Sequence, residues 1–231
     1  MTSHEIEISE IIEGLVGQIP LTITGVYDPI NLYTSVCSTA WLRVGKKIYD
    51  ATGNEFTITE IETDTYIKAV NTDGLTLDGV ITIYEPLFIS GTKMATSLEF
   101  TKISKDVIAK TPLIWLVEFI RLNKYGRESA LDFSTELRIF FLDETNILNY
   151  KTKDHRLNVV NPMGKLLDAF INVLRNDRRF KRVDEYEVLT FSRFGTETDA
   201  GAFQNILDAN LSGLELRITL EMYKENCKNC N

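Results

Sequence analysis

Residues 214–222 read Leu-Glu-Leu-Arg-Ile-Thr-Leu-Glu-Met, a strict alternation of apolar and polar side chains. Alternation with a period of two predicts a β-strand with one buried face and one face open to water or a partner. The polar side chains of this strand are Glu215, Arg217, Thr219 and Glu221, which are therefore candidates for contact with another copy of the chain.

A helix that can cover such a strand is predicted at residues 161–175. Its apolar side chains recur at intervals of three and one, which places them on one face of a helix. Asn161 suits the N-cap and Pro162 the first helical position. A basic cluster follows near the helix end, where cations interact favourably with the helix dipole. The members of this cluster are Arg175, Arg178, Arg179, Lys181 and Arg182.

Three further strands complete the predicted sheet. Residues 113–117 are almost wholly apolar, as in a strand covered on both faces. Residues 134–142 place Leu137, Ile139 and Phe141 on one face, and residues 185–194 are also predicted to be a strand. An amphipathic helix is predicted at residues 3–19.

The region between this first helix and the sheet has a different pattern. Short β-branched or aromatic runs alternate with turn sequences such as Thr52-Gly-Asn54 and Asp78-Gly79. Residues 40–44, 55–61, 65–70 and 80–84 are the predicted strands. Closely spaced strands with tight turns indicate a small antiparallel sheet or barrel.

These patterns predict an α+β fold in four segments. Residues 1–20 form an N-terminal helix that packs on the second domain, and residues 21–86 form a small β domain. Residues 87–111 are a connector. Residues 112–231 form a domain with a mixed sheet, one main amphipathic helix and a mobile tail.

Composition limits the function. The chain has 231 residues, 44% hydrophobic and 25% charged, with a net charge of −8. An acidic chain is a poor match for nucleic-acid phosphates, whose binding depends on Lys and Arg. The sequence has neither a secretory signal nor a window as apolar as a membrane span. Three cysteines make a disulfide framework improbable and favour synthesis in a reducing cytoplasm.

Residues with catalytic potential are few. His4 is expected at the surface of the first helix and His155 in a polar loop. No nucleophile-elbow, phosphate-loop, dinucleotide-binding or zinc-protease motif appears in the sequence, so we expect no enzyme activity and no cofactor. Cys227 and Cys230 form one CxxC pair at the tail, which is half of a zinc site and a weak metal candidate. Cys37 is expected to be buried and inert.

Several stretches resemble a known family. They are residues 45–50 (GKKIYD), 53–58 (GNEFTI), 86–96 (PLFISGTKMAT), 112–116 (PLIWL), 137–143 (LRIFFLD) and 210–220 (NLSGLELRITL). Together they are similar to virion proteins of tailed phages and prophages of Bacteroides-like hosts, including crAss-like phages. The order of helices and strands also resembles a tail terminator or a head–tail connector protein, with residues 21–86 as an insertion.

The resemblance implies a structural role in the virion. Copies would form a homo-oligomeric ring, six- or twelve-fold, in the neck or tail. The ring would contact portal, connector or tail proteins, and DNA would pass through it without sequence-specific binding. The oligomer-interface candidates are Arg175, Arg178, Arg179, Glu215, Arg217, Thr219 and Glu221.

Two other interpretations are open. The small β domain could bind a glycan or another ligand through Trp41, Tyr49 and Tyr66, although strand-core roles for these aromatics are the simpler explanation. An enzyme would have to use His155 and nearby acids, for which no mechanism is evident.

Overall fold

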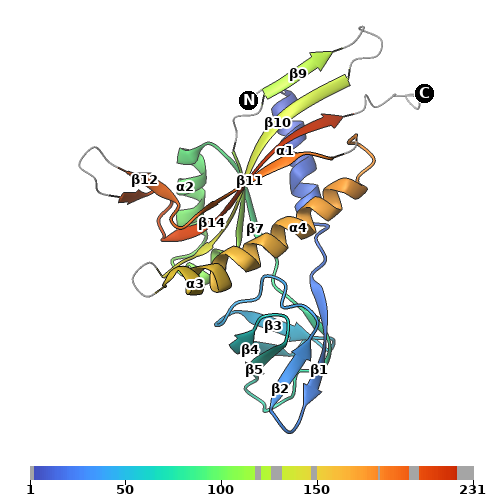
Figure 1. Cartoon of the computed structure of the whole chain (residues 1–231), viewed down its shortest axis with the longest axis vertical. Helices are drawn as coiled ribbons and strands as arrows, with labels where there is room; N and C mark the ends of the chain where they lie inside the picture. Colours follow the sequence, from blue (N-terminus) through green and yellow to red (C-terminus); the bar gives the residue numbers. More distant parts are fainter. Residues whose placement is uncertain are drawn as a thin grey trace.

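The structure, a computed structural model, describes residues 3–117, 121–125, 132–146, 150–181, 183–197 and 203–222. It has two units, a small barrel and a sheet covered by helices (Figure 1). The predicted α+β class is confirmed, because both helices and strands are abundant and the main sheet is mixed.

The barrel lies within residues 21–86. Its strands are β1 (Thr22–Asp28), β2 (Tyr33–Val36), β3 (Lys47–Asp50), β4 (Glu55–Glu62), β5 (Tyr66–Val70) and β6 (Gly79–Thr82). They close in the order β1-β2-β5-β4-β3-β6, so every strand has two partners. The interior is filled by large side chains at most 1% exposed, namely Ile48, Phe56, Ile58, Ile67 and Ile81. Closure leaves this unit without an open edge.

Residues 40–44 are not a strand, contrary to the sequence prediction. Ala40 has a left-handed φ of 45°, and the Leu42 N–H donates to the carbonyl of Thr39, so the chain turns here. Trp41 and Leu42 are buried in the core shared by the two units. Their aromatic and apolar character therefore serves packing between units, which a strand pattern cannot distinguish from a sheet position.

Residues 87–111 are not a simple connector. They contain β7 (Leu87–Gly91), α2 (Lys93–Ile103) and the short η1 (Ile108–Lys110), followed by β8 (Leu113–Val117). β7 pairs with β8 in parallel, and α2 lies on the crossover between them. A parallel pair requires such a crossover, so this segment belongs to the sheet unit.

The main sheet has the order β11-β14-β10-β8-β7, and β9 pairs with β10 beyond the end of β8. Its remaining strands are β9 (Arg121–Tyr125), β10 (Asp132–Glu144), β11 (Tyr186–Phe191) and β14 (Leu211–Met222). A two-stranded arm, β12 (Gly195–Glu197) with β13 (Phe203–Asn205), projects from it. Except for the β7–β8 pair, the pairings are antiparallel.

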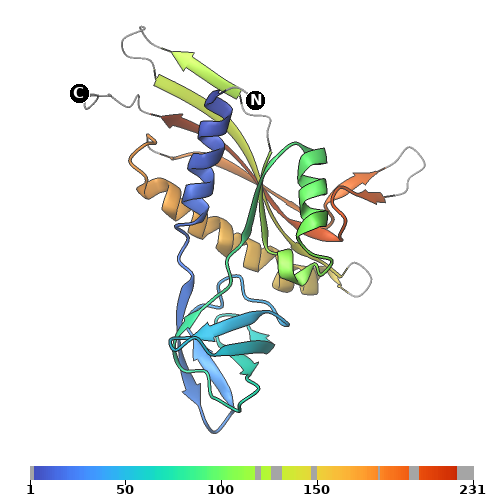
Figure 2. The ribbon, with the colours of Figure 1, turned by 180° about the vertical axis from the view of Figure 1, so that it is seen from behind.

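Two helices, α1 (Ser3–Val16) and α4 (Asn161–Asn176), cover one face of the sheet (Figure 2). The buried side chains of α4 are Met163, Leu166, Leu167, Phe170, Ile171 and Leu174. Asn161 is not an N-cap as predicted. The helix begins earlier, as α3 (Thr152–His155) and a π-helical turn η3 (Arg156–Val160), and continues through Asn161. Val159 is fully buried, so packing extends the helix back into the polar stretch.

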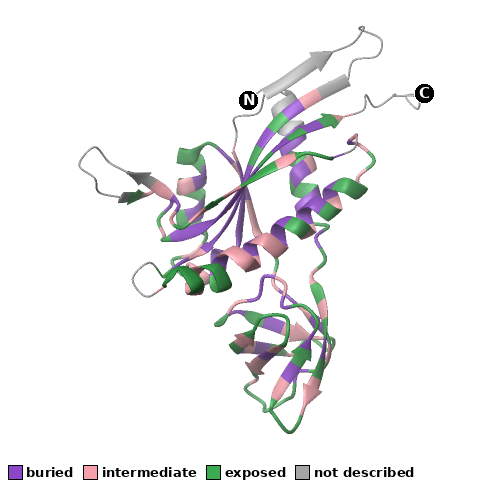
Figure 3. Cartoon of the chain, viewed as in Figure 1, coloured by how far each residue is buried: buried purple, intermediate pink, exposed green. Residues whose placement is uncertain are grey.

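The opposite face of the sheet is covered over part of its area. A second apolar cluster there joins Leu113, Trp115, Phe140 and Leu142 to Phe100 of α2 and to the segment around Leu207 and Leu211. Farther along the strands, residues on the same face are exposed (Figure 3). On β14 these residues are the polar Arg217, Thr219 and Glu221. The change occurs at Phe140, whose register partner on β14 is Glu215.

Ionic contacts connect the two units. Arg43, beside the barrel, donates to Asp143 and to Glu144 at the end of β10, both at 2.8 Å. Lys165 of α4 pairs with Asp64 in the β4–β5 turn. One apolar core includes residues of both units, so the barrel is held to the sheet unit by this core and by ion pairs to β10 and to α4.

Lys46 lies at the same junction and is 7% exposed. Its ammonium group donates to the carbonyls of Ile108 and Thr111 and lies 4.6 Å from the ring centroid of Tyr84. Burial lowers the pKa of Lys46 to about 8.

Within the described part of the chain, no helix is long and apolar enough to span a bilayer.

Candidate interaction surface

The open part of the second sheet face is formed by β10, β14 and β11. Arg217, Thr219 and Glu221 are exposed on β14, as the alternation predicts. β14 itself is a central strand, paired with β10 on one side and β11 on the other. Another copy can therefore contact β14 through its face but cannot add a strand to its edge. The sheet ends at β11 on one side and at β7 on the other, and β11 is the edge strand next to β14.

Glu215 differs from the other three polar side chains of β14, because it is 5% exposed. Its carboxylate accepts hydrogen bonds from Arg138 Nε at 2.6 Å and Arg217 Nε at 2.7 Å. Burial acts to raise the pKa of Glu215, but the bonds from Arg217 and Arg138 outweigh it and hold the pKa below its usual range. The two arginines face each other across the β10–β14 pair, so Glu215 neutralises a like-charge contact.

A shallow hollow of about 1010 Å³ lies beside this cluster. Its charged lining comprises Glu136, Arg138, Asp184, Glu185, Glu187, Arg217 and Glu221. Carboxylates outnumber guanidinium groups, so the hollow is acidic. The lining is open and polar, without the apolar walls typical of a small-molecule pocket.

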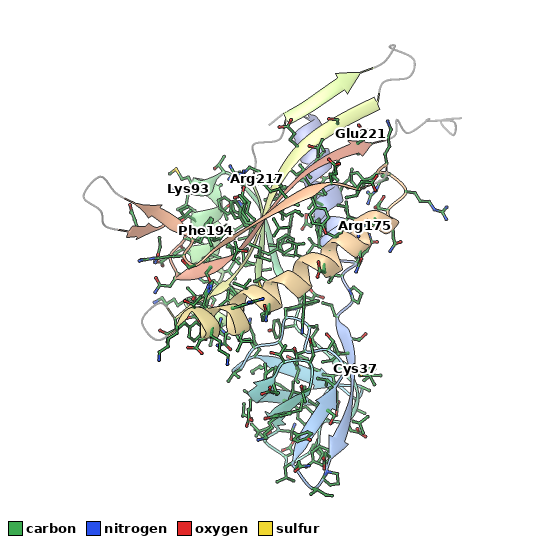
Figure 4. The ribbon with its side chains drawn as sticks, in the orientation of Figure 1. Cys37, Lys93, Arg175, Phe194, Arg217 and Glu221 are labelled. Atoms are coloured by element: carbon green, nitrogen blue, oxygen red, sulfur yellow. The ribbon has the colours of Figure 1, made fainter. Side chains whose placement is uncertain are left out.

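The basic cluster at the end of α4 is partly neutralised within the chain (Figure 4 labels Arg175). Arg175 donates to the Val183 carbonyl at 3.4 Å and lies over the Tyr186 ring. Arg179 is paired with Asp177, and Lys181 lies 3.3 Å from Glu221. Arg178 is exposed, and Arg182 lies outside the described residues. Three cations of this cluster, Arg175, Arg179 and Lys181, thus already contact other groups of the same chain.

The histidine and cysteine candidates are not brought together. His155 belongs to α3, not to a loop, and its Nε2 lies 2.8 Å from Ser212 Oγ. Burial lowers the pKa of His155. Cys37 is exposed, contrary to the prediction of a buried thiol. Cys227, Cys230 and the side chain of His4 lie outside the described residues. Among described side chains, no group of three or more His, Cys, Asp and Glu could hold a metal ion.

The three aromatics proposed for ligand binding do not form a common surface. Trp41 is buried, and its indole N–H donates to the Tyr84 carbonyl at 3.2 Å. Tyr66 stacks on Tyr33 with the ring centroids 4.5 Å apart. Tyr49 lies on β3, which is separated from the β5 strand of Tyr66 by β4. Trp41 therefore has a core role.

Sequence reasoning missed the residues that complete the polar face. Glu136 and Arg138 were assigned to a strand but not to a site, and Glu187 was not singled out. They alternate with apolar neighbours in the same way as residues 214–222, which is a usable signal. Which alternating strands lie side by side is decided by the β10–β14 and β11–β14 pairings.

Comparison with models of known protein families gives no match, and comparison with curated proteins gives none either.

Proposed function

We propose that this chain is a structural virion protein that assembles into a ring in the neck or tail of a tailed phage. It is of the tail-terminator or head–tail connector type and surrounds the DNA channel. The proposal starts from the sequence resemblance and assigns the chain a mechanical role. Its copies would hold one another and the neighbouring portal, connector or tail proteins through surface contacts.

The observation that carries the proposal is the order of elements around the main sheet. An N-terminal helix, the strands β8 and β10, the long helix α4 across one face, and the closing strands β11 and β14 follow one another in the chain. This is the order that the resemblance implies for a tail terminator. The barrel takes the place of an insertion, and β7 with α2 is an addition to the expected plan.

The chemistry of the described surface supports a binding role over catalysis. The polar groups on the open sheet face are engaged with one another, as in the Arg138–Glu215–Arg217 cluster. Among the described residues, no group of three or more His, Cys, Asp and Glu side chains that could hold a metal ion accompanies them. A net charge of −8 also suits a channel wall along which DNA slides without binding.

Localisation in the virion is the direct test. Gold-labelled antibodies against the purified chain should bind at the junction of head and tail in electron micrographs of partly disrupted phage particles. The same antibodies absorbed with the purified chain provide the control for specific labelling. A virion preparation that lacks the chain by quantitative mass spectrometry would refute the proposal.

A ring should also be visible apart from the virion. Negative-stain images of the purified chain at high concentration are expected to contain closed annular particles with a central opening wide enough for duplex DNA. Particles with a blocked centre, or with two-fold symmetry alone, would contradict a role around the DNA channel.

A further inference from the structure

The end of the barrel that lies far from the sheet contains the β1–β2 turn and the β5–β6 connection (Figure 1). Of the twelve exposed large hydrophobic residues in the described part of the chain, six lie in these two connections or in the strands next to them, namely Val26, Ile30, Leu32, Val70, Leu75 and Val80. Ile30 is 88% exposed and Leu32 is 66% exposed. Single exposed apolar residues are ordinary, but a concentration of them marks an interaction site. We name this end the barrel tip.

The barrel tip consists of two loops held together by hydrogen bonds. The β1–β2 turn and the β5–β6 connection meet where the Tyr27 N–H donates to Asp78 and the Thr34 hydroxyl donates to the Leu77 carbonyl. Asp28 accepts from the backbone N–H groups of Ile30 and Asn31 at 2.8 and 3.1 Å. The apolar side chains are therefore displayed on a fixed frame.

Leu32 adopts a left-handed φ of 55°. A bulky residue in this region is uncommon and costs of order 1 kcal/mol, while Asn or Gly would take the position more easily. A solvent-facing turn gains nothing from leucine here. A partner that covers the leucine would account for both its exposure and its conformation.

A smaller apolar surface lies on the outer side of α2 in the other unit. Met94 and Leu98 are one turn apart and are 74% and 53% exposed. The same helix buries Thr96, whose hydroxyl has no hydrogen-bond partner. A helix that faced water alone would place polar residues outward and apolar ones inward, and α2 departs from this pattern. We name Met94, Leu98 and the next residue on this side, Lys102, the α2 stripe.

The charges around the two surfaces are opposite. The barrel tip carries Asp28, Asp73 and Asp78, and residues 21–42 and 69–83 contain no Lys, Arg or His. Lys102 of the α2 stripe is exposed, as are the nearby Lys93 and Lys105, and these three cations outnumber the two exposed anions of the same stretch, Glu99 and Asp106. An apolar centre with a polar rim of complementary sign is the anatomy of a specific protein–protein contact.

The absence of cations also bears on what covers the barrel tip. Anionic membrane surfaces and nucleic acids both attract Lys and Arg, so an acidic rim disfavours them. Within one molecule the barrel tip cannot reach α2, because the Arg43–Asp143 and Lys165–Asp64 pairs fix the barrel beside the sheet with its tip pointing away. The complementary surface must therefore belong to another molecule.

We propose that the barrel tip of one copy docks on the α2 stripe of the next copy, in a head-to-tail contact. Because the two surfaces differ, the contact is heterologous and each copy retains one free tip and one free stripe. Repetition of such a contact closes rings or extends filaments. The inference rests on the proposed ring function and names the contact that would build the ring.

The contact is expected to be weak for an isolated pair. It involves fewer residues than the 20–30 per side, roughly, of a stable interface. Ring closure compensates because each copy then makes two contacts, the second at a high effective concentration. The assembly should therefore depend steeply on protein concentration.

Two variants of the full chain test the contact. Ile30→Ser/Leu32→Asn removes the apolar tip and gives position 32 a residue that tolerates a left-handed φ. Met94→Gln/Leu98→Gln removes the stripe with residues that favour helices. Leu157→Gln, which changes an exposed apolar residue outside both surfaces, is the control. Sedimentation equilibrium should give an apparent association constant at least tenfold lower for each variant and unchanged for the control, with unchanged far-UV circular dichroism throughout.

Mixing the two variants gives the sharper result. At millimolar concentration, high enough to populate a single weak contact, each variant alone should stay monomeric. Their equimolar mixture should form one-to-one heterodimers that grow no further, because one competent tip meets one competent stripe. A stripe variant that still dimerises indicates tip-to-tip contact and overturns the proposal. So does a wild-type chain that remains monomeric at millimolar concentration, or a mixture that forms no heterodimer.

Charge reversal provides an independent check. Asp73→Lys and Lys102→Glu should each weaken association, and mixing these two variants should partly restore it at low salt. Equal association constants for all forms would contradict the charge pairing.

The proposed contact and the proposed function can fail separately. A chain that antibodies locate at the virion neck but that assembles independently of tip and stripe would refute this contact alone. A chain that assembles through them but is absent from virions would refute the proposed function alone.

Discussion

The barrel and the sheet unit bury their apolar residues in different ways. The barrel closes on itself, so strands of four to eight residues suffice, and its interior is filled by a few isoleucines and one phenylalanine. The sheet is open and needs α1 and α4 on one face and α2 on the other. A closed unit can leave apolar residues exposed at its tip without losing its core, whereas the open sheet exposes polar residues wherever a helix is missing.

The largest effect should come from truncating the sheet core. Phe141→Ala removes a fully buried ring that lies 5.8 Å from the ring of Phe170. The free energy of unfolding should fall by about 3–5 kcal/mol, because the cavity adds to the lost transfer energy. Phe56→Ala makes the same change in the barrel. Calorimetry of both variants compares the units: one shared transition in each would show that they unfold together, and a separate barrel transition in Phe56→Ala would show that they do not.

The junction should give the next largest effect. Arg43→Ala leaves Asp143, whose side chain is 2% exposed, without the cation that pairs with it. An uncompensated buried carboxylate costs several kcal/mol, so we expect a loss of about 2–4 kcal/mol. Urea unfolding measures the loss, and limited proteolysis should show faster cleavage between barrel and sheet. A matched change at the exposed pair of β3 and β4, Lys47→Ala, should cost less than about 1 kcal/mol. Equal losses would contradict a junction role for Arg43.

The stability of the junction should depend on pH through Lys46. Its pKa is about 8 in the folded chain and 10.5 in an unfolded one, so the unfolded chain binds more protons between these values. The contribution of Lys46 to the free energy of unfolding should therefore be lowest below pH 8 and rise towards pH 10.5, by of order 1–3 kcal/mol. The difference between wild type and Lys46→Met, measured by urea unfolding at pH 7 to 10, should follow this rise. A difference independent of pH would refute it.

The smallest effects compare glycines of the two units. Gly164 lies in α4 with no atom near the position of an added Cβ, so Gly164→Ala should raise the free energy of unfolding by about 0.5–1 kcal/mol. Gly53 lies in a barrel turn with a φ of +86°, where Ala is strained, so Gly53→Ala should lower it by about 1 kcal/mol. Thermal denaturation measures whether each substitution raises or lowers the free energy of unfolding. A higher free energy of unfolding for both variants would contradict the left-handed turn geometry at Gly53.

The strongly periodic segments were predictable from sequence. From Leu216 to Glu221 the alternation matches the buried and exposed faces of β14, and Glu215 is the exception because it is buried. The spacing of Met163, Leu166 and Phe170 matches the buried face of α4. In both cases one repeated pattern corresponds to one buried face, which is the condition under which periodicity decides structure.

The errors fall where tertiary contacts override local pattern. Residues 40–44 resemble a strand because Trp41 and Leu42 are apolar, but these side chains pack between the two units. α2 has no amphipathic pattern, since it exposes Met94 and buries Thr96, so periodicity could not identify it. The polar neighbours of His155 predict a loop, but the segment is helical and buries Val159 one turn farther on.

The same distinction between local pattern and tertiary contact applies to the candidate surface. Sequence alternation placed Arg217, Thr219 and Glu221 on an outer face, and all three are exposed. It could not show that Glu215 is enclosed by Arg138 and Arg217, because Arg138 lies 77 residues away along the chain.

The amino-acid sequence by itself determined the α+β class, the faces of the long helix and strands, and the acidic charge of the chain, because these follow from residue type and spacing. The tertiary structure alone decided which strands are neighbours, which polar groups are paired, and where apolar residues stay exposed. Those properties depend on contacts between residues far apart in the sequence, and no local period encodes them. The barrel tip and the α2 stripe belong to this second group.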